Sequence, residues 1–160
     1  MSLTIPKPLA LLMDFDGVLT DDTVYVDQDG KEMVRCHRGD GFGIGLLRSL
    51  APIAVFSKER NPVVARRCEK LQIDCQHGID DKLPAVTRYL AERQLTLDNA
   101  VFVGNDLNDL ECVKAAGLGV AVADAHPDLC LVADLVLRRP GGQGAIRELI
   151  EHYLLPALRR

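Results

Sequence analysis

The sequence lacks any hydrophobic run long enough to cross a membrane, and it lacks a recognisable secretion signal. Its apolar stretches are far shorter than the ~20 residues that a membrane-spanning helix needs. Residues 1–7 do not contain the apolar core of a signal peptide. These absences predict a cytoplasmic protein that does not act at a membrane.

Clustered metal-binding and redox residues are also missing. No Cys-x-x-Cys pair occurs, and the four histidines show no ligand spacing. The odd number of scattered cysteines indicates reduced structural thiols, as expected in the cytoplasm. These are Cys36, Cys68, Cys75, Cys112 and Cys130. We therefore expect neither a disulfide framework nor a zinc site.

The chain has no basic tract, and its net charge is −4, which argues against nucleic acid as the main partner. With 160 residues, 48% of them apolar and 26% charged, it has the composition of a soluble globular protein. A chain of this length suits one domain with a sizeable core. No repeat, linker or low-complexity segment divides it, so we expect a single domain over residues 1–160.

The most informative stretch is an apolar run that ends in two carboxylates. Leu9–Met13 reads as a strand buried on both faces, and Asp14, Asp16 and Gly17 follow it. Side chains two positions apart on an extended chain point the same way, and Gly17 allows the chain to turn. Two close carboxylates repel unless a cation or a proton joins them. The pattern indicates a divalent metal, acid/base chemistry, or only an acidic turn.

Strand-like and helix-like segments alternate along the rest of the chain. An antiparallel β-hairpin is expected at about 23–35, around Asp-Gly. Further strands are expected at 52–56, 73–75, 100–103, 120–122 and 135–137. Helices are expected at 42–50 with Asp40 as N-cap, from Asn61-Pro62 to 71, and at 82–93, 107–116 and 145–155. This alternation predicts a three-layer α/β Rossmann-like fold with a parallel sheet.

Polar residues follow the ends of three of these strands. Asp14 and Asp16 follow the first, and Ser57, Lys58 and Glu59 follow the second. The third is followed by Asn105, Asp106, Asn108 and Asp109, and Lys82 stands at a helix start between the second and third. In an open parallel sheet, ligands bind beyond the carboxyl ends of the strands. The set therefore predicts a site for a phosphate group and a hard cation.

These residues resemble the four motifs of the haloacid dehalogenase superfamily of phosphohydrolases, in the same order. The matching residues are Asp14-Phe15-Asp16-Gly17-Val18-Leu19-Thr20, then Ser57, then Lys82, then Gly104-Asn105-Asp106-Leu107-Asn108-Asp109. The resemblance implies that Asp14 is the nucleophile and Asp16 the general acid/base. It implies that Ser57 and Lys82 hold the phosphoryl group. It also implies a Mg²⁺ site formed by Asp14, Asp16 and the cluster Asn105, Asp106 and Asp109.

The gap between Asp16 and Ser57 and the gap between Lys82 and Asn105 are too short to hold a cap domain, and the hairpin is the only insertion in the first gap. The chain resembles the capless group that contains 3-deoxy-D-manno-octulosonate 8-phosphate phosphatase. Matching stretches are Arg38-Gly39-Asp40-Gly41, Gly78-Ile79-Asp80-Asp81-Lys82-Leu83, Ala121-Val122-Ala123-Asp124-Ala125-His126-Pro127 and Gly141-Gly142-Gln143-Gly144-Ala145-Ile146-Arg147-Glu148. The resemblance implies a homotetramer in which the hairpin acts as a flap over a neighbouring site.

The substrates of that group are phosphates of acidic eight- or nine-carbon keto-sugars. Arg38, Arg66 and Arg147 are candidates to bind the sugar carboxylate, because arginine can bind a carboxylate bidentately. The alternative is that they form surface or interface ion pairs. The resemblance also assigns Gly41, Lys58 and Glu59 to the substrate site.

Two departures from the group matter. Ser57-Lys58-Glu59 stands where Thr-Gly-Arg is typical, and it looks more like the phosphatase-like domain found with acylneuraminate cytidylyltransferases and like nine-carbon keto-sugar 9-phosphatases. Asn105 stands where an Asp ligand is expected, so Mg²⁺ binding should weaken. The leading hypothesis is a Mg²⁺-dependent phosphatase of an octulosonate or nonulosonate (sialic acid type) phosphate. The alternative is a weakly active or inactive oligomerisation module associated with a nucleotide-sugar synthetase.

Overall fold

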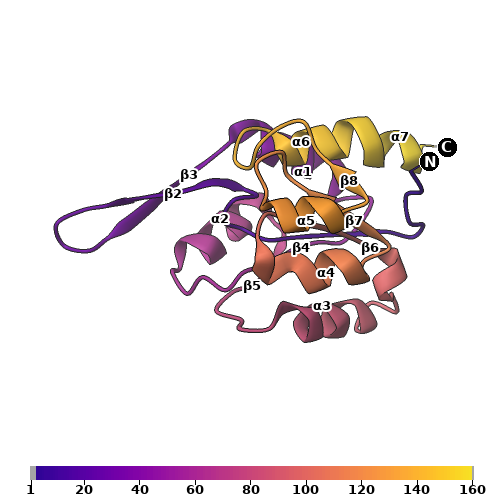
Figure 1. The fold of residues 1–160 in the computed structure, drawn as a ribbon, viewed down its shortest axis with the longest axis horizontal. Coiled ribbons are helices and arrows are strands. Elements are labelled where there is room, and N and C mark those ends of the chain that lie inside the picture. Colours follow the sequence, from indigo (N-terminus) through magenta and orange to yellow (C-terminus); the bar gives the residue numbers. More distant parts are fainter. Residues whose placement is uncertain (1–2, 160) are drawn as a thin grey trace.

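The computed structural model describes residues 3–159 and shows a six-stranded parallel sheet with helices on both faces (Figure 1). The strand order is β5-β4-β1-β6-β7-β8, which puts the expected first strand in the middle of the sheet. The bounds are β1 (Ala10–Met13), β4 (Ile53–Phe56), β5 (Asp74–Gln76), β6 (Ala100–Gly104), β7 (Leu118–Ala121) and β8 (Leu135–Val136). Every pairing is parallel.

Two hydrophobic clusters cover the two faces of the sheet, because alternate residues of each strand point to opposite sides. Leu11 and Met13 of β1 pack into one cluster, whereas Ala10 and Leu12 pack into the other. The first cluster includes side chains of α1 (Arg38–Leu47), α2 (Val63–Leu71) and α6 (Ala145–Leu149). The second includes side chains of α3 (Lys82–Ala91), α4 (Leu110–Ala115) and α5 (Pro127–Val132). The predicted three-layer fold without a cap domain is confirmed.

The hairpin extends away from this body as a two-stranded ribbon (Figure 1). It consists of β2 (Thr20–Val26) and β3 (Glu32–Cys36), slightly longer than the expected 23–35. Its base is joined by an ion pair of 2.7 Å between Arg35 and Asp21, at the point where the strand register shifts. Most of its apolar side chains are exposed, so the hairpin contributes little to the core.

The prediction that Asp40 caps a helix at 42–50 is wrong. The helix begins at Arg38 and ends at Leu47, and the N-cap is His37, whose Nδ1 accepts a hydrogen bond from the Gly39 amide. Asp40 lies in the first turn, is 1% exposed, and accepts hydrogen bonds from the amides of Gly144 (3.3 Å) and Arg147 (2.9 Å). Asp40 therefore caps the N-terminus of α6, a helix that begins about a hundred residues later in the sequence.

Several boundaries also differ from the predictions. Pro62 precedes α2 as its N-cap instead of opening it, and Asn61 Oδ1 accepts a hydrogen bond from the Val63 amide. The helix expected at 107–116 begins as a 3₁₀ turn, Leu107–Asp109, and α3 ends at Ala91. The last helix contains a π-helical turn, Ile150–Leu154, before α7 (Leu155–Leu158). The short helix α5 was not predicted, because six residues carry too little periodicity. Over residues 3–159, no helix has the length and apolar character needed to span a membrane.

Candidate active site

The polar residues that follow β1 and β6 meet at the carboxyl edge of the sheet, as the parallel topology requires. The Asp14 amide donates to the Val103 carbonyl (3.0 Å), which aligns the end of β1 with the end of β6. A cavity of about 370 Å³ opens at this edge. It is lined by Asp14, Asp16, Asp22, Asn105, Asp106, Leu107 and Asn108.

At the base of the site, one lysine joins two carboxylates that come from different elements. Lys82 Nζ, at the start of α3, lies 2.6 Å from Asp14 Oδ2 and 2.7 Å from Asp109 Oδ1. The three side chains are almost completely buried. The second oxygen of Asp109 accepts a hydrogen bond from the Asn105 amide (3.0 Å). We refer to Asp14, Lys82 and Asp109 as the buried triad.

The pKa values in the triad reflect competition between burial and ion pairing. Burial raises the pKa of Asp14, although Lys82 opposes the shift. Burial and the charge of Asp14 raise the pKa of Asp109 to about 6. Burial alone would lower the pKa of Lys82, but the two carboxylates outweigh it and raise that pKa. Lys82 therefore stays charged, and it has more negative partners than it can neutralise.

Asp16 lies beside the triad in a different environment. It is about half buried, and burial raises its pKa. Its Oδ1 accepts a hydrogen bond from the Thr20 hydroxyl (3.2 Å). Ser57 is 2% exposed, and its Oγ accepts a hydrogen bond from the Glu59 amide (3.1 Å), so its hydroxyl proton is available to an incoming ligand.

The donor set fits a small hard cation. Three carboxylates, Asp14, Asp16 and Asp109, face one ammonium, which leaves two negative charges unbalanced. Asn105 Oδ1 is buried and has no hydrogen-bond partner, and such an atom is costly unless a ligand satisfies it. The Asn105 side chain lies directly over Gly17, where any Cβ would collide with it. Carboxylate and amide oxygens are ligands that Mg²⁺ accepts.

The predicted metal ligands differ in their contacts and in whether they line the cavity. Over residues 3–159, no three side chains of the His, Cys, Asp and Glu types gather as a metal cluster. Both oxygens of Asp109 are already engaged, by Lys82 and by the Asn105 amide. Asp106 lines the cavity while its Oδ1 accepts from the Leu107 amide (2.7 Å). The oxygens of Asp14 are also engaged, by the Phe15 amide (2.7 Å) and by Lys82, but Asp14, Asp16, Asn105 and Asp106 line the cavity, whereas Asp109 is not part of its lining.

Some of the expected substrate residues line a second cavity, of about 550 Å³, between β3, α1 and α2. Arg38, Gly41 and Arg66 belong to its lining. Cys36 also lines this cavity. The pKa of its thiol is raised, chiefly by burial; the charge of Arg67 partly opposes the shift and the charge of Asp16 adds to it. Cys36 therefore lies close enough to Arg67 and to Asp16 to feel the charges of both.

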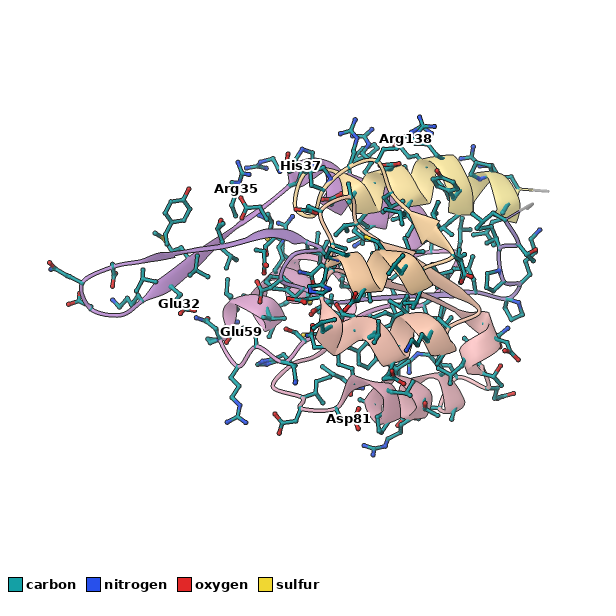
Figure 2. The ribbon with its side chains drawn as sticks, viewed as in Figure 1. Glu32, Arg35, His37, Glu59, Asp81 and Arg138 are labelled. Atoms are coloured by element: carbon teal, nitrogen blue, oxygen red, sulfur yellow. The ribbon has the colours of Figure 1, made fainter. Side chains whose placement is uncertain are left out.

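The remaining expected substrate residues lie elsewhere. Arg147 stacks on the ring of Phe42 at 4.9 Å and pairs with Glu151 at 3.1 Å, outside the described cavity linings. Lys58 and Glu59 lie in the loop after β4, where Glu59 Oε1 accepts from the Asn61 amide. Asn61 Nδ2 donates to Glu32 of β3 (3.4 Å), so this loop reaches the hairpin, and Figure 2 shows Glu32 and Glu59 on the same flank.

Sequence reasoning missed three residues of these two sites. Arg67 and Lys70 line the second cavity, and Arg67 Nε is buried without a partner. On a helix, Arg67 and Lys70 lie on the same face as Val63, and this spacing could have placed them together in the sequence analysis. Thr20 was quoted only as part of a motif, and the contact that matters, with Asp16, needs the folded turn.

Comparison with known proteins identifies the family of this chain. The model of the family described as haloacid dehalogenase-like hydrolase matches residues 66–149. The 3-deoxy-D-manno-octulosonate 8-phosphate phosphatase of Escherichia coli K12 is 38% identical over 147 residues, which cover 91% of this chain and 78% of that protein.

Two solved structures show the same fold. A haloacid dehalogenase family hydrolase from Streptomyces avermitilis has a TM-score of 0.92 at 45% identity, covering 98% of this chain and 91% of that one. The 3-deoxy-D-manno-octulosonate 8-phosphate phosphatase of Moraxella catarrhalis, in complex with magnesium, phosphate and KDO, has a TM-score of 0.87 at 31% identity, covering 91% of this chain and 85% of that one.

The triad makes a prediction about stability. Lys82→Met leaves two buried carboxylates without their cation, so we expect a loss of about 3–5 kcal/mol near pH 8 in chelator-treated buffer. Lys82 lowers the pKa of both carboxyl groups, so in the variant Asp14 and Asp109 should stay protonated to a higher pH than in the wild type, where the pKa of Asp109 is about 6. The loss should therefore shrink as pH falls from 8 towards 6, because the variant then buries neutral carboxyl groups.

Denaturant unfolding at several pH values measures this difference. Lys114→Met is the matched control, since Lys114 is exposed and pairs only loosely with Glu111 at 3.6 Å; we expect a change below about 0.5 kcal/mol. A Lys82→Met deficit that stays constant with pH would show that the triad is not the cause.

Proposed function

Because the chain belongs to the haloacid dehalogenase-like hydrolase family, we propose that it is a phosphatase that hydrolyses the phosphomonoester of an acidic keto-sugar. The observation that carries this proposal is the buried triad beside Asp16: one carboxylate, Asp14, is held by an ammonium at 2.6 Å, and a second, separately bonded carboxylate lies two residues away. Paired carboxylates in different environments suit a nucleophile and an acid/base.

The first chemical step uses these two carboxylates. A carboxylate oxygen of Asp14 attacks phosphorus, the bond from phosphorus to the sugar oxygen breaks, and a proton moves from Asp16 to that oxygen. Lys82 keeps Asp14 in place and offsets the repulsion between carboxylate and phosphate. The Ser57 hydroxyl donates to a phosphoryl oxygen. The products are the free sugar and an aspartyl phosphate.

The second step returns the protein to its starting state. Asp16, now a carboxylate, takes a proton from water, and the water oxygen attacks phosphorus. The bond between phosphorus and Asp14 breaks, which releases inorganic phosphate, restores the Asp14 carboxylate and leaves Asp16 protonated, as at the start. The raised pKa of Asp16 suits this exchange, because the group holds a proton more readily than an ordinary aspartate.

We propose Mg²⁺ as the cofactor, held by Asp14, Asp16 and Asn105, with Asp106 close by. When bound, the ion supplies positive charge that offsets the charge of the phosphoryl group. Support comes from the unbalanced negative charge and from the unpartnered Asn105 Oδ1. Asp109, a further ligand that the family resemblance implies, pairs with Lys82 and accepts a hydrogen bond from the Asn105 amide.

The second cavity supports an acidic substrate. Its lining includes four cationic side chains, Arg38, Arg66, Arg67 and Lys70, and only Arg66 has an acidic partner nearby, the exposed Glu69. A carboxylated sugar phosphate has two anionic ends, one for each cavity. The first candidate substrate is 3-deoxy-D-manno-octulosonate 8-phosphate, which the names of the relatives contain. The second is a nonulosonate 9-phosphate, because the loop Ser57-Lys58-Glu59 resembles that of nine-carbon keto-sugar 9-phosphatases.

We propose that residues 1–160 form one phosphatase domain that works as a homotetramer in the cytoplasm. The hairpin exposes Val24 (51%), Tyr25, Val26 and Met33 (62% each), and an exposed apolar patch of this kind marks an interaction surface. A two-stranded ribbon alone is marginally stable, so contact with another subunit explains its length. The five cysteines are free, which supports a reducing compartment.

A different class of function, an oligomerisation module associated with a nucleotide-sugar synthetase, is favoured by one observation. Asn105 supplies an uncharged oxygen where the family pattern has a carboxylate, which weakens the cation site. The intact triad and Asp16 favour the enzyme, because an inactive module has no need for buried charges that cost stability.

Phosphate release tests the proposed activity. We expect Mg²⁺-dependent turnover of 3-deoxy-D-manno-octulosonate 8-phosphate or a nonulosonate 9-phosphate, abolished by a chelator and by Asp14→Asn. Asp14→Asn keeps the shape of the side chain but removes the attacking carboxylate. If the wild type releases no more phosphate than Asp14→Asn from either substrate, the module is the better description.

The role of Asn105 has its own test. Asn105→Asp adds a charged ligand, so calorimetry should show Mg²⁺ binding tightened on the order of tenfold, about 1.4 kcal/mol. Gln28→Glu, the same chemical change in the exposed hairpin turn, should leave the affinity as it was. An unchanged affinity in Asn105→Asp means that position 105 is not a ligand.

The hairpin predicts the assembly state. Light scattering should give a tetramer for the wild type and a smaller species for Tyr25→Lys, because a charge on the exposed ribbon cannot be buried in an interface. Leu131→Lys is the control, since Leu131 is 82% exposed on α5. A monomeric wild type at working concentration refutes the tetramer.

A further inference from the structure

Thr20 is a fully buried polar residue at the point where the catalytic turn becomes the hairpin. Its hydroxyl donates to Asp16 Oδ1 and accepts from the amides of Gly17 and Asp22, each at 3.2 Å. A hydroxyl has one proton and two acceptor positions, so this set uses its full capacity. The single proton goes to the carboxylate proposed as acid/base, which leaves the other oxygen of Asp16 free to face the substrate.

The backbone around Thr20 is arranged to keep these bonds. Asp22 has a φ of 62°, a conformation that costs a residue with a side chain about 1–3 kcal/mol. In that conformation its amide reaches the Thr20 hydroxyl. Thr20 also pairs with Cys36 of β3, and its amide donates to the Phe15 carbonyl (3.2 Å). Hairpin, turn and acid/base are therefore joined through one side chain.

The loop Gly141-Gly142 lies against the same turn. The Gly142 amide donates to the Val18 carbonyl (3.0 Å), and the Gly141 amide donates to Asp124 Oδ1 (2.9 Å). A Cβ at Gly141 would collide with the Gly17 carbonyl, and one at Gly142 would collide with the backbone of Thr20. Gly142 also has a φ of 64°, which favours glycine. The glycines thus allow two backbone segments, distant in sequence, to touch.

We propose that Thr20 is the positioning residue for Asp16, and that the Gly141-Gly142 loop keeps Thr20 in place. The inference rests on the proposed role of Asp16 as acid/base. Without the hydroxyl, Asp16 can rotate away from the oxygen that leaves with the sugar. A sugar alkoxide needs a proton to leave, whereas a nitrophenolate does not. Loss of positioning therefore affects alkyl phosphates and spares aryl phosphates, a selectivity that a general weakening of the fold does not produce.

The test compares kcat/KM for 3-deoxy-D-manno-octulosonate 8-phosphate and para-nitrophenyl phosphate. This ratio reports only the steps up to release of the alcohol or phenol. Thr20→Val, nearly the same shape without a hydroxyl, should lose about 10²-fold with the sugar phosphate and less than about 3-fold with the aryl phosphate. Thr20→Ser, which keeps the hydroxyl, should retain both rates within about 3-fold.

Two further variants complete the test. Gly142→Ala should show the same selective loss as Thr20→Val, because the added methyl displaces Thr20. If Thr20→Val does not fold, Gly142→Ala tests the positioning role in its place. Thr23→Val, on the exposed part of β2 where the hydroxyl bonds only Asp21, should change neither rate.

Equal losses on both substrates in Thr20→Val and Gly142→Ala would overturn the positioning role and leave the proposed function standing. Full activity of Thr20→Val with the sugar phosphate would do the same. A wild type that turns over neither para-nitrophenyl phosphate, nor 3-deoxy-D-manno-octulosonate 8-phosphate, nor a nonulosonate 9-phosphate would overturn the proposed function, and the positioning role with it.

Discussion

The structure depends on one electrostatic constraint, the burial of Asp14 and Asp109 around Lys82. Isolated charges are costly to bury, and these are tolerated because Lys82 lies within 2.7 Å of both carboxylates. The three groups come from the end of β1, the start of α3 and the turn after β6, so only the assembled sheet brings them together. The triad still carries excess negative charge. That imbalance favours the binding of a cation at the open edge of the sheet.

A second set of contacts surrounds Asp16 and explains motifs that do not touch the reacting atoms. Asp40 caps α6 and thereby fixes the segment that begins with Gly141. That segment lies against Thr20, and Thr20 bonds Asp16. The Gly141-Gly142 loop is therefore linked to Asp16 through Thr20, and β2 of the hairpin begins at the same threonine.

Much of this architecture could be predicted from the sequence because it follows from local rules. The run Leu9–Met13 identified the central strand, and the rule that parallel strands share a carboxyl edge brought Asp14, Asp16, Ser57, Lys82 and Asn105 together. What could not be predicted depends on contacts between distant segments. Asp40 reads as a local helix cap, but it caps a helix a hundred residues later. The family resemblance implies that Asp109 is a metal ligand, whereas its contacts with Lys82 and with the Asn105 amide could be found only in the folded structure. Thr20 looks like an ordinary strand residue until the turn is folded.

The proposed phosphatase mechanism depends most directly on Asp14 as the nucleophile. Borohydride reduction of an acyl phosphate, followed by mass spectrometry of the peptides, detects a phosphorylated carboxylate directly. We expect the reduced residue at position 14 when Asp16→Asn, which slows hydrolysis of the intermediate, is incubated with Mg²⁺ and para-nitrophenyl phosphate, whose leaving group needs no proton from residue 16. Phosphate release by the wild type with no reduced residue at position 14, or with the label on another carboxylate, would contradict the account.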